Sequence, residues 1–184
     1  MSAAWITLVV TMTSALGAAA FPPQQSSPGI HPDIHYVPTS GGVTDAMLKL
    51  AKVTPNDVVY NLGSGDGRIV IAAAKKYGAR GVGIELDPEL IKTATKNARK
   101  AGVADKVRFV QADLFKADFS EATVVTLYLS NSINRRLASI LQRQLKPGSR
   151  IVSHRFDMGD WVPEADVRLE GTRVFLWTIH QPER

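Results

Sequence analysis

The sequence predicts a single α/β domain with a mostly parallel, doubly wound sheet, which has helices on both faces. Three observations predict it. Short apolar, β-branched runs alternate with longer segments rich in helix formers from about residue 44 onward. The first of these strands passes into its helix through a turn with three glycines. The last two runs follow each other without a helix, so a hairpin adds an antiparallel strand at the end of the chain.

Seven strands are expected in this order, and a helix is expected after each of the first, second and fourth, with one more before the first. The strands span residues 57–60, 81–85, 106–111, 122–129, 150–154, 165–169 and 173–180. The helices span residues 44–53, 69–77, 88–101 and the stretch from a polar loop at 130–134 to about residue 145. Thr44 and Asp87 are the expected N-caps, Pro88 suits a first helical position, and Gly102 ends the third helix.

The composition bounds the possible functions. A chain of 184 residues with 45% hydrophobic and 21% charged residues suits one soluble domain with its own core. The absence of cysteine excludes disulfides, thiolate nucleophiles and cysteine metal sites. The four histidines lack the spacing of metal ligands on a helix, so no metal is expected. The net charge of +5 permits acidic partners, but solvated lysines and arginines on helix faces explain most such excesses, and a nucleic-acid partner is not expected.

The amino-terminal residues have the composition of a targeting segment. Residues 1–21 are hydrophobic, carry no charge between Ala3 and Phe21, and end in three small residues, 18–20. This pattern suits a signal peptide or a marginal membrane anchor. Residues 22–34 are rich in Pro, Gln and Ser and form a linker, so the folded domain is expected over residues 35–184. We expect an anchor with the domain on the cytoplasmic side; the alternative is cleavage near Ala20 and export.

The glycine turn at residues 61–68 (NLGSGDGR) has the construction of a ligand-binding loop. Glycines permit backbone angles and close approaches that a Cβ forbids, and the following helix directs free N–H groups toward the turn. Dinucleotide sites prefer the spacing G-x-G-x-x-G, whereas this turn reads Gly63-x-Gly65-x-Gly67 with Arg68 at the place of the third glycine. The spacing therefore disfavours a dinucleotide.

Acidic residues at three successive strand ends indicate the ligand. Asp66 within the turn disfavours a pyrophosphate and favours a cationic group. Glu85 ends the second strand about twenty residues later, where a carboxylate accepts hydrogen bonds from ribose hydroxyls. It has little expected structural purpose there. Asp113 follows the third strand and suits an adenine amino group. S-Adenosylmethionine has a ribose, an adenine and a cationic end, and it has no phosphate.

Three motifs in this order, NLGSGDGR, GVGIELD and QADLF, resemble the cofactor motifs of class I (seven-strand) S-adenosylmethionine-dependent methyltransferases. The resemblance implies a Rossmann-like fold. It also implies a cofactor site that contains Asn61, Gly63, Gly65, Asp66, Gly67, Glu85, Asp113 and Leu114.

A narrower resemblance is to one family of protein-lysine methyltransferases, which includes the crenarchaeal broad-specificity enzyme and the enzyme of the mitochondrial ATP synthase c subunit. It rests on residues 36–39 (YVPT), 57–74, 124–129 (VVTLYL) and 150–161 (RIVSHRFDMGDW). The resemblance implies that Tyr36 and Thr39 fold over the cofactor and form the lysine entrance. The family usually has Asp where this chain has Asn61, and often Leu-Pro at the start of the 130–134 loop.

The expected reaction is methyl transfer to the ε-amine of a protein lysine. An apolar or aromatic channel lowers the pKa of the amine, so no dedicated base is required. The residues expected at the acceptor are Tyr128 and Asn131 as catalytic residues, with Asn134, His154, Phe156 and Trp161 as substrate contacts. Core packing is an alternative for the aromatic residues, a structural role for His154 and a helix cap for Asp66. The alternative functions are methylation of RNA or a small molecule, or cofactor binding without catalysis.

Overall fold

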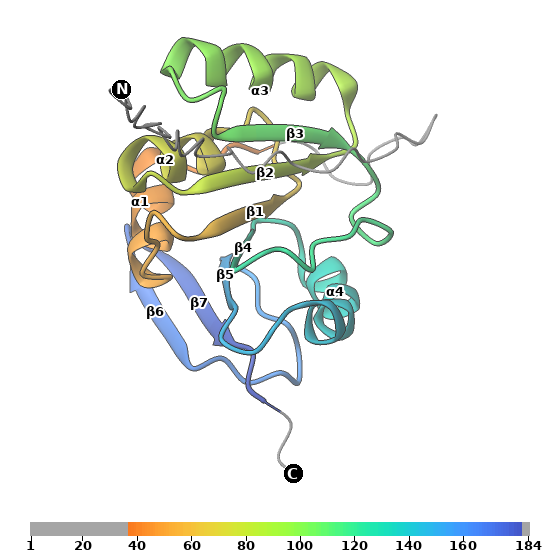
Figure 1. Cartoon of the computed structure of the whole chain (residues 1–184). Helices are drawn as coiled ribbons and strands as arrows, with labels where there is room; N and C mark the ends of the chain where they lie inside the picture. The colour runs from red at the N-terminus through yellow and green to blue at the C-terminus, as the bar shows by residue number, and fades with distance from the viewer. Residues whose placement is uncertain (1–36, 182–184) are drawn as a thin grey trace, which may run out of the picture.

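The computed structural model describes residues 37–181, and within them it contains a seven-stranded sheet flanked by four helices (Figure 1). The strand order is β3-β2-β1-β4-β5-β7-β6; β1 to β5 pair in parallel, and β7 runs antiparallel to both β5 and β6. The predicted fold class is therefore confirmed. The elements are α1 (Gly41–Leu50), β1 (Val58–Leu62), α2 (Arg68–Tyr77), β2 (Arg80–Glu85), α3 (Pro88–Ala101), β3 (Val107–Gln111), β4 (Val124–Leu127), α4 (Asn131–Gln144), β5 (Arg150–His154), β6 (Ala165–Leu169) and β7 (Thr172–Thr178).

Three expectations lie outside the described residues: the hydrophobic segment 1–21, the linker 22–34 and Tyr36. Within residues 37–181, no helix has the length and apolar character to cross a membrane.

The sheet separates two apolar layers. One contains the buried sides of α1 and α2 with the small residues of α3, and the other contains α4 with the loop after β3. Successive side chains of β1 point to opposite faces of the sheet and therefore contribute to both layers. Val59 faces the first layer, whereas Val58, Tyr60 and Leu62 face the second. Because both faces of β1 are covered, all five of its residues are buried.

Helix α1 begins and ends about three residues earlier than predicted. Ser40, not Thr44, is its N-cap, and the Ser40 hydroxyl accepts a hydrogen bond from the Val43 N–H at 3.3 Å. Gly41 and Gly42 occupy the first turn, where glycine costs little because the helix has few hydrogen bonds there. The helix ends at Leu50 rather than Val53.

Helix α4 also begins earlier than expected, because the polar residues 130–134 are not a loop. Ser130 is its N-cap, and Asn131 and Asn134 lie in the first turn. The caps predicted for α3 are confirmed: Asp87 accepts a hydrogen bond from the Glu89 N–H, and Gly102 ends the helix in the left-handed conformation. Strand β4 is shorter than the predicted 122–129, and β1 continues to Leu62.

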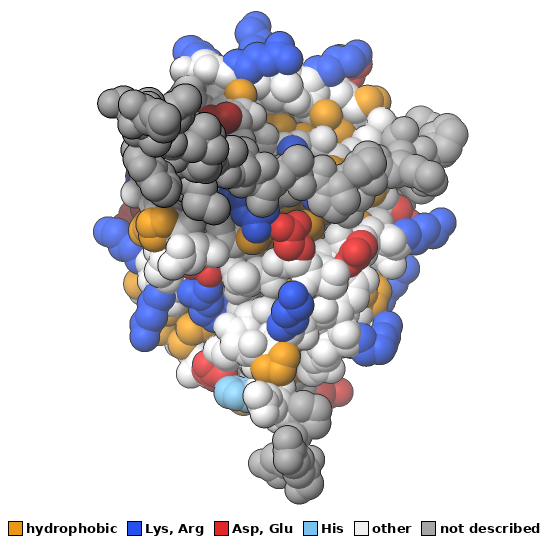
Figure 2. Space-filling model, viewed as in Figure 1, with side chains coloured by type: hydrophobic (Ala, Val, Ile, Leu, Met, Phe, Trp, Pro, Cys, Tyr) orange, Lys and Arg blue, Asp and Glu red, His pale blue; other side chains and the backbone are white. Residues whose placement is uncertain are grey.

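Exposed lysines and arginines lie along the outer side of α3, at the top of the molecule in Figure 2. They include Lys92, Lys96, Arg99 and Lys100. Side chains of both signs are spread over the rest of the face that Figure 2 shows. This is the distribution of a solvated helix face.

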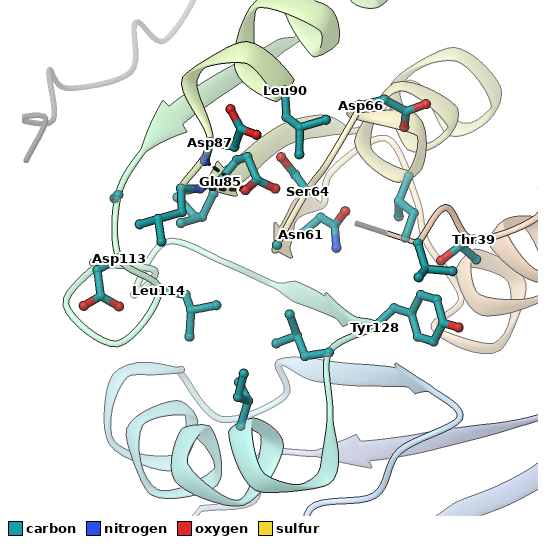
Figure 3. A pocket seen from close by; sticks show the side chains of 18 of the residues that line it. Thr39, Asn61, Ser64, Asp66, Glu85, Asp87, Leu90, Asp113, Leu114 and Tyr128 are labelled. Carbon is teal, nitrogen blue, oxygen red and sulfur yellow. Dashed lines mark hydrogen bonds between the residues drawn. The ribbon is translucent and has the colours of Figure 1, made fainter. Parts of the chain in front are cut away.

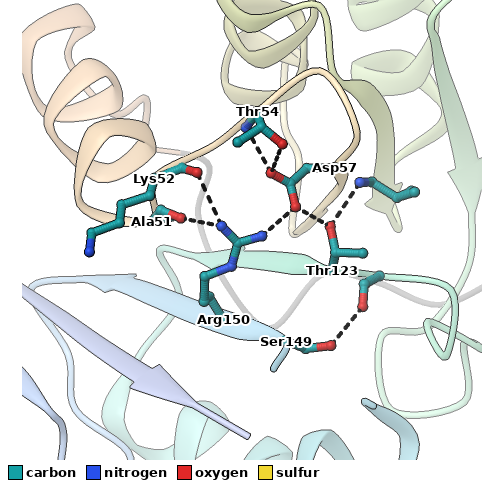
Figure 4. Close-up of polar contacts among 9 residues, drawn as sticks. Ala51, Lys52, Thr54, Asp57, Thr123, Ser149 and Arg150 are labelled. Carbon is teal, nitrogen blue, oxygen red and sulfur yellow. Dashed lines mark hydrogen bonds and ion pairs between the residues drawn. The ribbon is translucent and has the colours of Figure 1, made fainter. Parts of the chain in front are cut away.

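A polar network ties the amino ends of three strands to the end of α1 (Figure 4). The Asp57 carboxylate accepts hydrogen bonds from the Thr54 N–H at 2.7 Å and the Thr123 hydroxyl at 2.6 Å, and it forms an ion pair with Arg150. Arg150 Nη1 also donates to the carbonyl of Ala51 at 2.6 Å. This network therefore fixes the end of α1 against β1, β4 and β5.

Burial raises the pKa of Asp57, but the hydrogen bonds from Thr123 and Thr54 and the charge of Arg150 outweigh it. The pKa of this carboxyl consequently lies below its ordinary value in the folded protein. Its contribution to stability is complete at pH values above the unfolded pKa and is lost as the pH falls through the folded pKa.

Replacement of Asp57 by Asn should lower the free energy of unfolding by about 3 kcal/mol, because Arg150 loses its buried charge partner. Urea denaturation at pH 7 measures this. The exposed Asp105→Asn variant is the control and should change stability by less than about 0.5 kcal/mol. The difference between wild type and Asp57→Asn should shrink below about pH 4. An equal difference at pH 7 and pH 3 would contradict this assignment.

Candidate active site

The turn after β1 needs its glycines for both backbone angle and space. Gly63, Gly65 and Gly67 have φ values of +73°, +54° and +80°, which L side chains rarely adopt. A Cβ on Gly63 would lie 2.7 Å from Leu129 Cδ2, and one on Gly67 would lie 2.5 Å from Phe109 Cζ. The turn thus packs closely against β3 and the end of β4.

The Glu85 carboxylate holds this turn in place. Its Oε2 accepts a hydrogen bond from the Gly65 N–H at 2.7 Å, while Oε1 accepts from the N–H groups of Leu86 at 2.7 Å and Asp87 at 3.1 Å. Figure 3 shows Glu85 between the glycine turn and the start of α3. The expectation that Glu85 has little structural purpose is therefore wrong, because one buried carboxylate joins β2, the turn and α3.

A cavity of about 450 Å³ opens above the carboxyl ends of β1 to β4. Most of the predicted cofactor residues within the described part of the chain line it (Figure 3): Thr39, Asn61, Gly63, Asp66, Glu85, Asp113 and Leu114. Tyr128 lines it from the side of β4. Gly65 and Gly67 are buried in the turn beside it.

Asp66 is paired with Arg68. Arg68 Nε donates to Asp66 Oδ1 at 2.9 Å and Nη2 to Oδ2 at 2.7 Å, while Nη1 donates to the Thr39 carbonyl at 2.7 Å. Asp66 Oδ1 also accepts from the Arg68 N–H at 3.2 Å, so part of its role is that of a helix-start acceptor. A cationic ligand at Asp66 would share the carboxylate with Arg68. Sequence reasoning considered Arg68 only as the residue at the place of the third dinucleotide glycine, and its contact with Thr39 could not be inferred from spacing.

Asn61 makes a contact that Asp could not make. Its Nδ2 donates to the carbonyl of Thr126 on β4 at 3.0 Å, and the side chain is buried. Because a carboxylate cannot donate, Asn at this position adds a hydrogen bond between β1 and β4 in the floor of the cavity. Asp113, after β3, also lines the cavity, and its Oδ1 accepts a hydrogen bond from the Phe115 N–H at 2.9 Å.

The cavity suits an adenosine-like ligand that carries no phosphate. The carboxylates of Glu85, Asp87 and Asp113 line it together with apolar side chains of Leu90 and Leu114. Carboxylates accept hydrogen bonds from hydroxyl and amino groups and repel phosphate. Ser64 also lines the cavity, and its buried hydroxyl has no hydrogen-bond partner among residues 37–181. These residues fit S-adenosylmethionine.

Three rings predicted at the acceptor side lie together at the ends of β4 and β5. The rings of Tyr128 and His154 have centroids 4.0 Å apart, and those of Tyr128 and Phe156 are 6.1 Å apart and nearly parallel. Burial, and then the charge of Arg155, hold the pKa of His154 below its ordinary value, so the imidazole is neutral at pH 7. The three rings form an aromatic cluster beside the cavity.

A tight turn after β5 positions this cluster. The Phe156 N–H donates to the His154 carbonyl at 2.9 Å, and Asn134 Nδ2 donates to the Phe156 carbonyl and to the Ser153 hydroxyl, both at 3.0 Å. Asn134 is fully buried, so it supports the aromatic cluster from α4. Asn131 lies exposed at the start of the same helix.

Trp161 lies apart from the cavity and the aromatic cluster. Its ring is 6.1 Å from that of Trp177, and its carbonyl accepts a hydrogen bond from Trp177 Nε1 at 2.8 Å. This is the core packing under the hairpin that the sequence left open as an alternative. Phe115 and Arg136, which sequence reasoning missed, instead line the cavity, and the Arg136 guanidinium lies 3.8 Å from the Phe115 ring centroid.

Comparison with known proteins decides the family. Residues 61–165 match the family described as the ANTKMT methyltransferase domain. The chain belongs to this methyltransferase family. It is 44% identical over 153 residues to a protein-lysine N-methyltransferase of Saccharolobus islandicus, across 80% of this chain and 95% of the relative.

Two further similarities support the assignment. The adenine nucleotide translocase lysine N-methyltransferase of Mus musculus is 36% identical, across 80% of this chain and 64% of that protein. The crystal structure of an RNA methyltransferase from Salinibacter ruber in complex with S-adenosyl-L-homocysteine superposes with a TM-score of 0.78 at 61% identity, across 80% of this chain and 97% of that one. The methyltransferase is thus an enzyme that uses S-adenosylmethionine, as the sequence predicted.

The Glu85→Ala variant of the methyltransferase should bind S-adenosylmethionine about 10- to 100-fold more weakly, because the turn loses the acceptor for the Gly65 N–H. Isothermal titration measures the affinity, and circular dichroism establishes that the variant is folded. Glu89→Gln, an exposed acid of α3, is the matched control and should bind as the wild type does. Undiminished binding by Glu85→Ala would overturn the site assignment.

Proposed function

We propose that the enzyme transfers a methyl group from S-adenosylmethionine to the ε-amine of lysine residues in a protein. The observation that carries the proposal is the aromatic cluster of Tyr128, His154 and Phe156 beside the cofactor cavity. The relatives that are named as lysine methyltransferases support it.

The cluster suits a lysine acceptor because of its chemistry. When bound, S-adenosylmethionine supplies a methyl group activated by a cationic sulfur, and the acceptor must be a neutral amine aligned with it. Aromatic walls at Tyr128 and Phe156 remove water from the amine and lower its pKa. The same ring faces stabilise the cationic methylated product. The neutral imidazole of His154 does not repel an approaching ammonium group.

RNA is the second candidate acceptor, because the Salinibacter ruber structure is described as an RNA methyltransferase. The basic net charge permits it. The RNP-like aromatic pattern of RNA-binding modules does not occur in the sequence, and the exposed basic residues of α3 lie on a solvated helix. The lysine acceptor is therefore the better supported one.

Incubation of the enzyme with radiolabelled S-adenosylmethionine and a mixture of proteins and RNA tests the acceptor directly. We expect label in protein, on lysine side chains, as mass spectrometry of the labelled bands would establish. Label that enters only RNA would refute the lysine acceptor.

Truncation of Phe156 to Ala should lower kcat/KM for a lysine-containing substrate about tenfold, since one wall of the aromatic cluster is lost. The affinity for S-adenosylmethionine should stay within about twofold of wild type, because Phe156 does not line the cofactor cavity. Val162→Ala, at a side chain that is 79% exposed, is the control and should leave both values unchanged. Equal losses in both quantities would point to a general disturbance of the site instead.

We further propose that residues 3–21 attach the enzyme to a membrane with its domain on the cytoplasmic side. The uncharged, apolar composition of this segment supports the proposal, as does the cytosolic synthesis of S-adenosylmethionine. Mass spectrometry of the native amino terminus tests it. A retained segment is expected, and a chain that starts at Phe21 would refute it.

A further inference from the structure

A second recess lies next to the aromatic cluster. It has a volume of about 370 Å³ and is lined by His154, Arg155, Arg168, Gly171, Thr172 and Arg173. Because β7 runs antiparallel to β5, the β6–β7 turn lies at the same edge of the sheet as the carboxyl ends of the parallel strands. Tyr128 lines the cofactor cavity, His154 lines this recess, and their rings are in contact. The recess is thus one pair of rings away from the cofactor cavity.

Three arginines from three segments meet in this recess. Arg168 and Arg173 are directly opposite each other in the β6–β7 pair, and like charges in that position are destabilising. Asp166 compensates Arg173, whose Nε donates to Asp166 Oδ1 at 3.1 Å. Arg155 and Arg168 form no ion pair with an acidic residue in the described part of the chain. The charge of Asp166 also acts on Arg168, and that of Asp157 acts on Arg173, so two acids face three arginines and these groups keep a net positive charge.

The backbone conformation of Arg155 is a second unfavourable feature of the recess, beside the opposed arginines. Its φ of +70° is in the left-handed region, which is unfavourable for a long side chain. The Arg155 N–H donates to the Arg173 carbonyl at 2.8 Å, so this conformation is fixed against β7. Strained residues of this kind are concentrated at binding and catalytic sites.

The buried His154 side chain gives a third indication of a ligand. It is 8% exposed, and its Nδ1 has no hydrogen-bond partner among residues 37–181. A buried polar nitrogen without a partner is costly, which is a reason to expect that it is satisfied when another molecule binds.

We propose that this recess binds the carboxylate of an Asp or Glu residue of the acceptor protein, a few residues from the lysine that is methylated. Guanidinium groups bind carboxylates through paired, charge-assisted hydrogen bonds, and Arg155 and Arg168 are available for them. An acidic residue bound there removes the cost of the opposed arginines and leaves the neighbouring lysine beside the aromatic cluster. This inference rests on the proposed lysine acceptor and specifies its sequence context.

The test compares two peptides that contain one lysine, with either Glu or Gln at the neighbouring positions, in assays with the full-length enzyme and saturating S-adenosylmethionine. The wild type should methylate the Glu peptide with a KM about tenfold lower and a similar kcat. Added salt should reduce this difference, because the arginines are exposed.

The Arg155→Gln and Arg168→Gln variants should each lose most of the difference between the peptides, while their affinity for S-adenosylmethionine stays unchanged. Arg143→Gln, at an exposed position in the last turn of α4, is the control and should keep the preference for the Glu peptide.

The outcomes separate this inference from the function on which it rests. Equal KM values for the two peptides in the wild type would overturn the carboxylate site while the lysine acceptor stands. A control variant with the same loss as Arg155→Gln would also overturn it. If neither peptide is methylated and label enters RNA, the lysine acceptor itself is wrong.

Discussion

The site depends on one carboxylate, Glu85, which accepts hydrogen bonds from the backbone of the glycine turn and from the backbone before α3. A turn with three left-handed glycines is costly in conformational entropy, so it needs such a constraint to keep one shape. Glu85 supplies it at the carboxyl edge, while the network of Asp57 and Arg150 fixes the amino edge of the same strands. The cavity is therefore held from both ends of the sheet before any ligand binds, which lowers the ordering cost of binding.

Much of the fold could be predicted from the sequence because its signals are local. The central strands β1 and β4 are buried on both faces and read as continuous apolar runs, and Asp87, Pro88 and Gly102 are unambiguous limits of α3. The start of α1 was wrong because Thr44 was the expected N-cap, whereas Ser40 caps a helix whose first turn contains Gly41 and Gly42. The start of α4 was wrong for a related reason: polar residues suggest a loop, but Ser130 caps a helix and Asn134 is buried within it.

The cofactor side of the site was more predictable than the acceptor side. Each glycine or acidic residue of the cofactor site belongs to a short continuous motif at the end of a parallel strand. The carboxyl ends of these strands lie at one edge of the sheet, so the topology brings the motifs together. The acceptor side depends on contacts between distant segments, such as that of Asn134 with the turn after β5. Trp161, which was expected there, packs against Trp177 instead. Residue type alone does not show whether an aromatic ring faces a cavity or a core. The pairing of Arg68 with Asp66 and Thr39 was likewise not evident from spacing.

The hairpin leaves β6 at one edge of the sheet, and this edge carries exposed charges at Asp166 and Arg168. Charged side chains on an edge strand oppose the addition of another strand from outside. A polypeptide acceptor therefore gains little from backbone pairing along β6, in contrast to domains that capture their ligands as an extra strand. Its lysine would be presented as a side chain from an exposed loop or terminus. Recognition of this kind depends on a few side chains of the acceptor and is compatible with many conformations of its backbone.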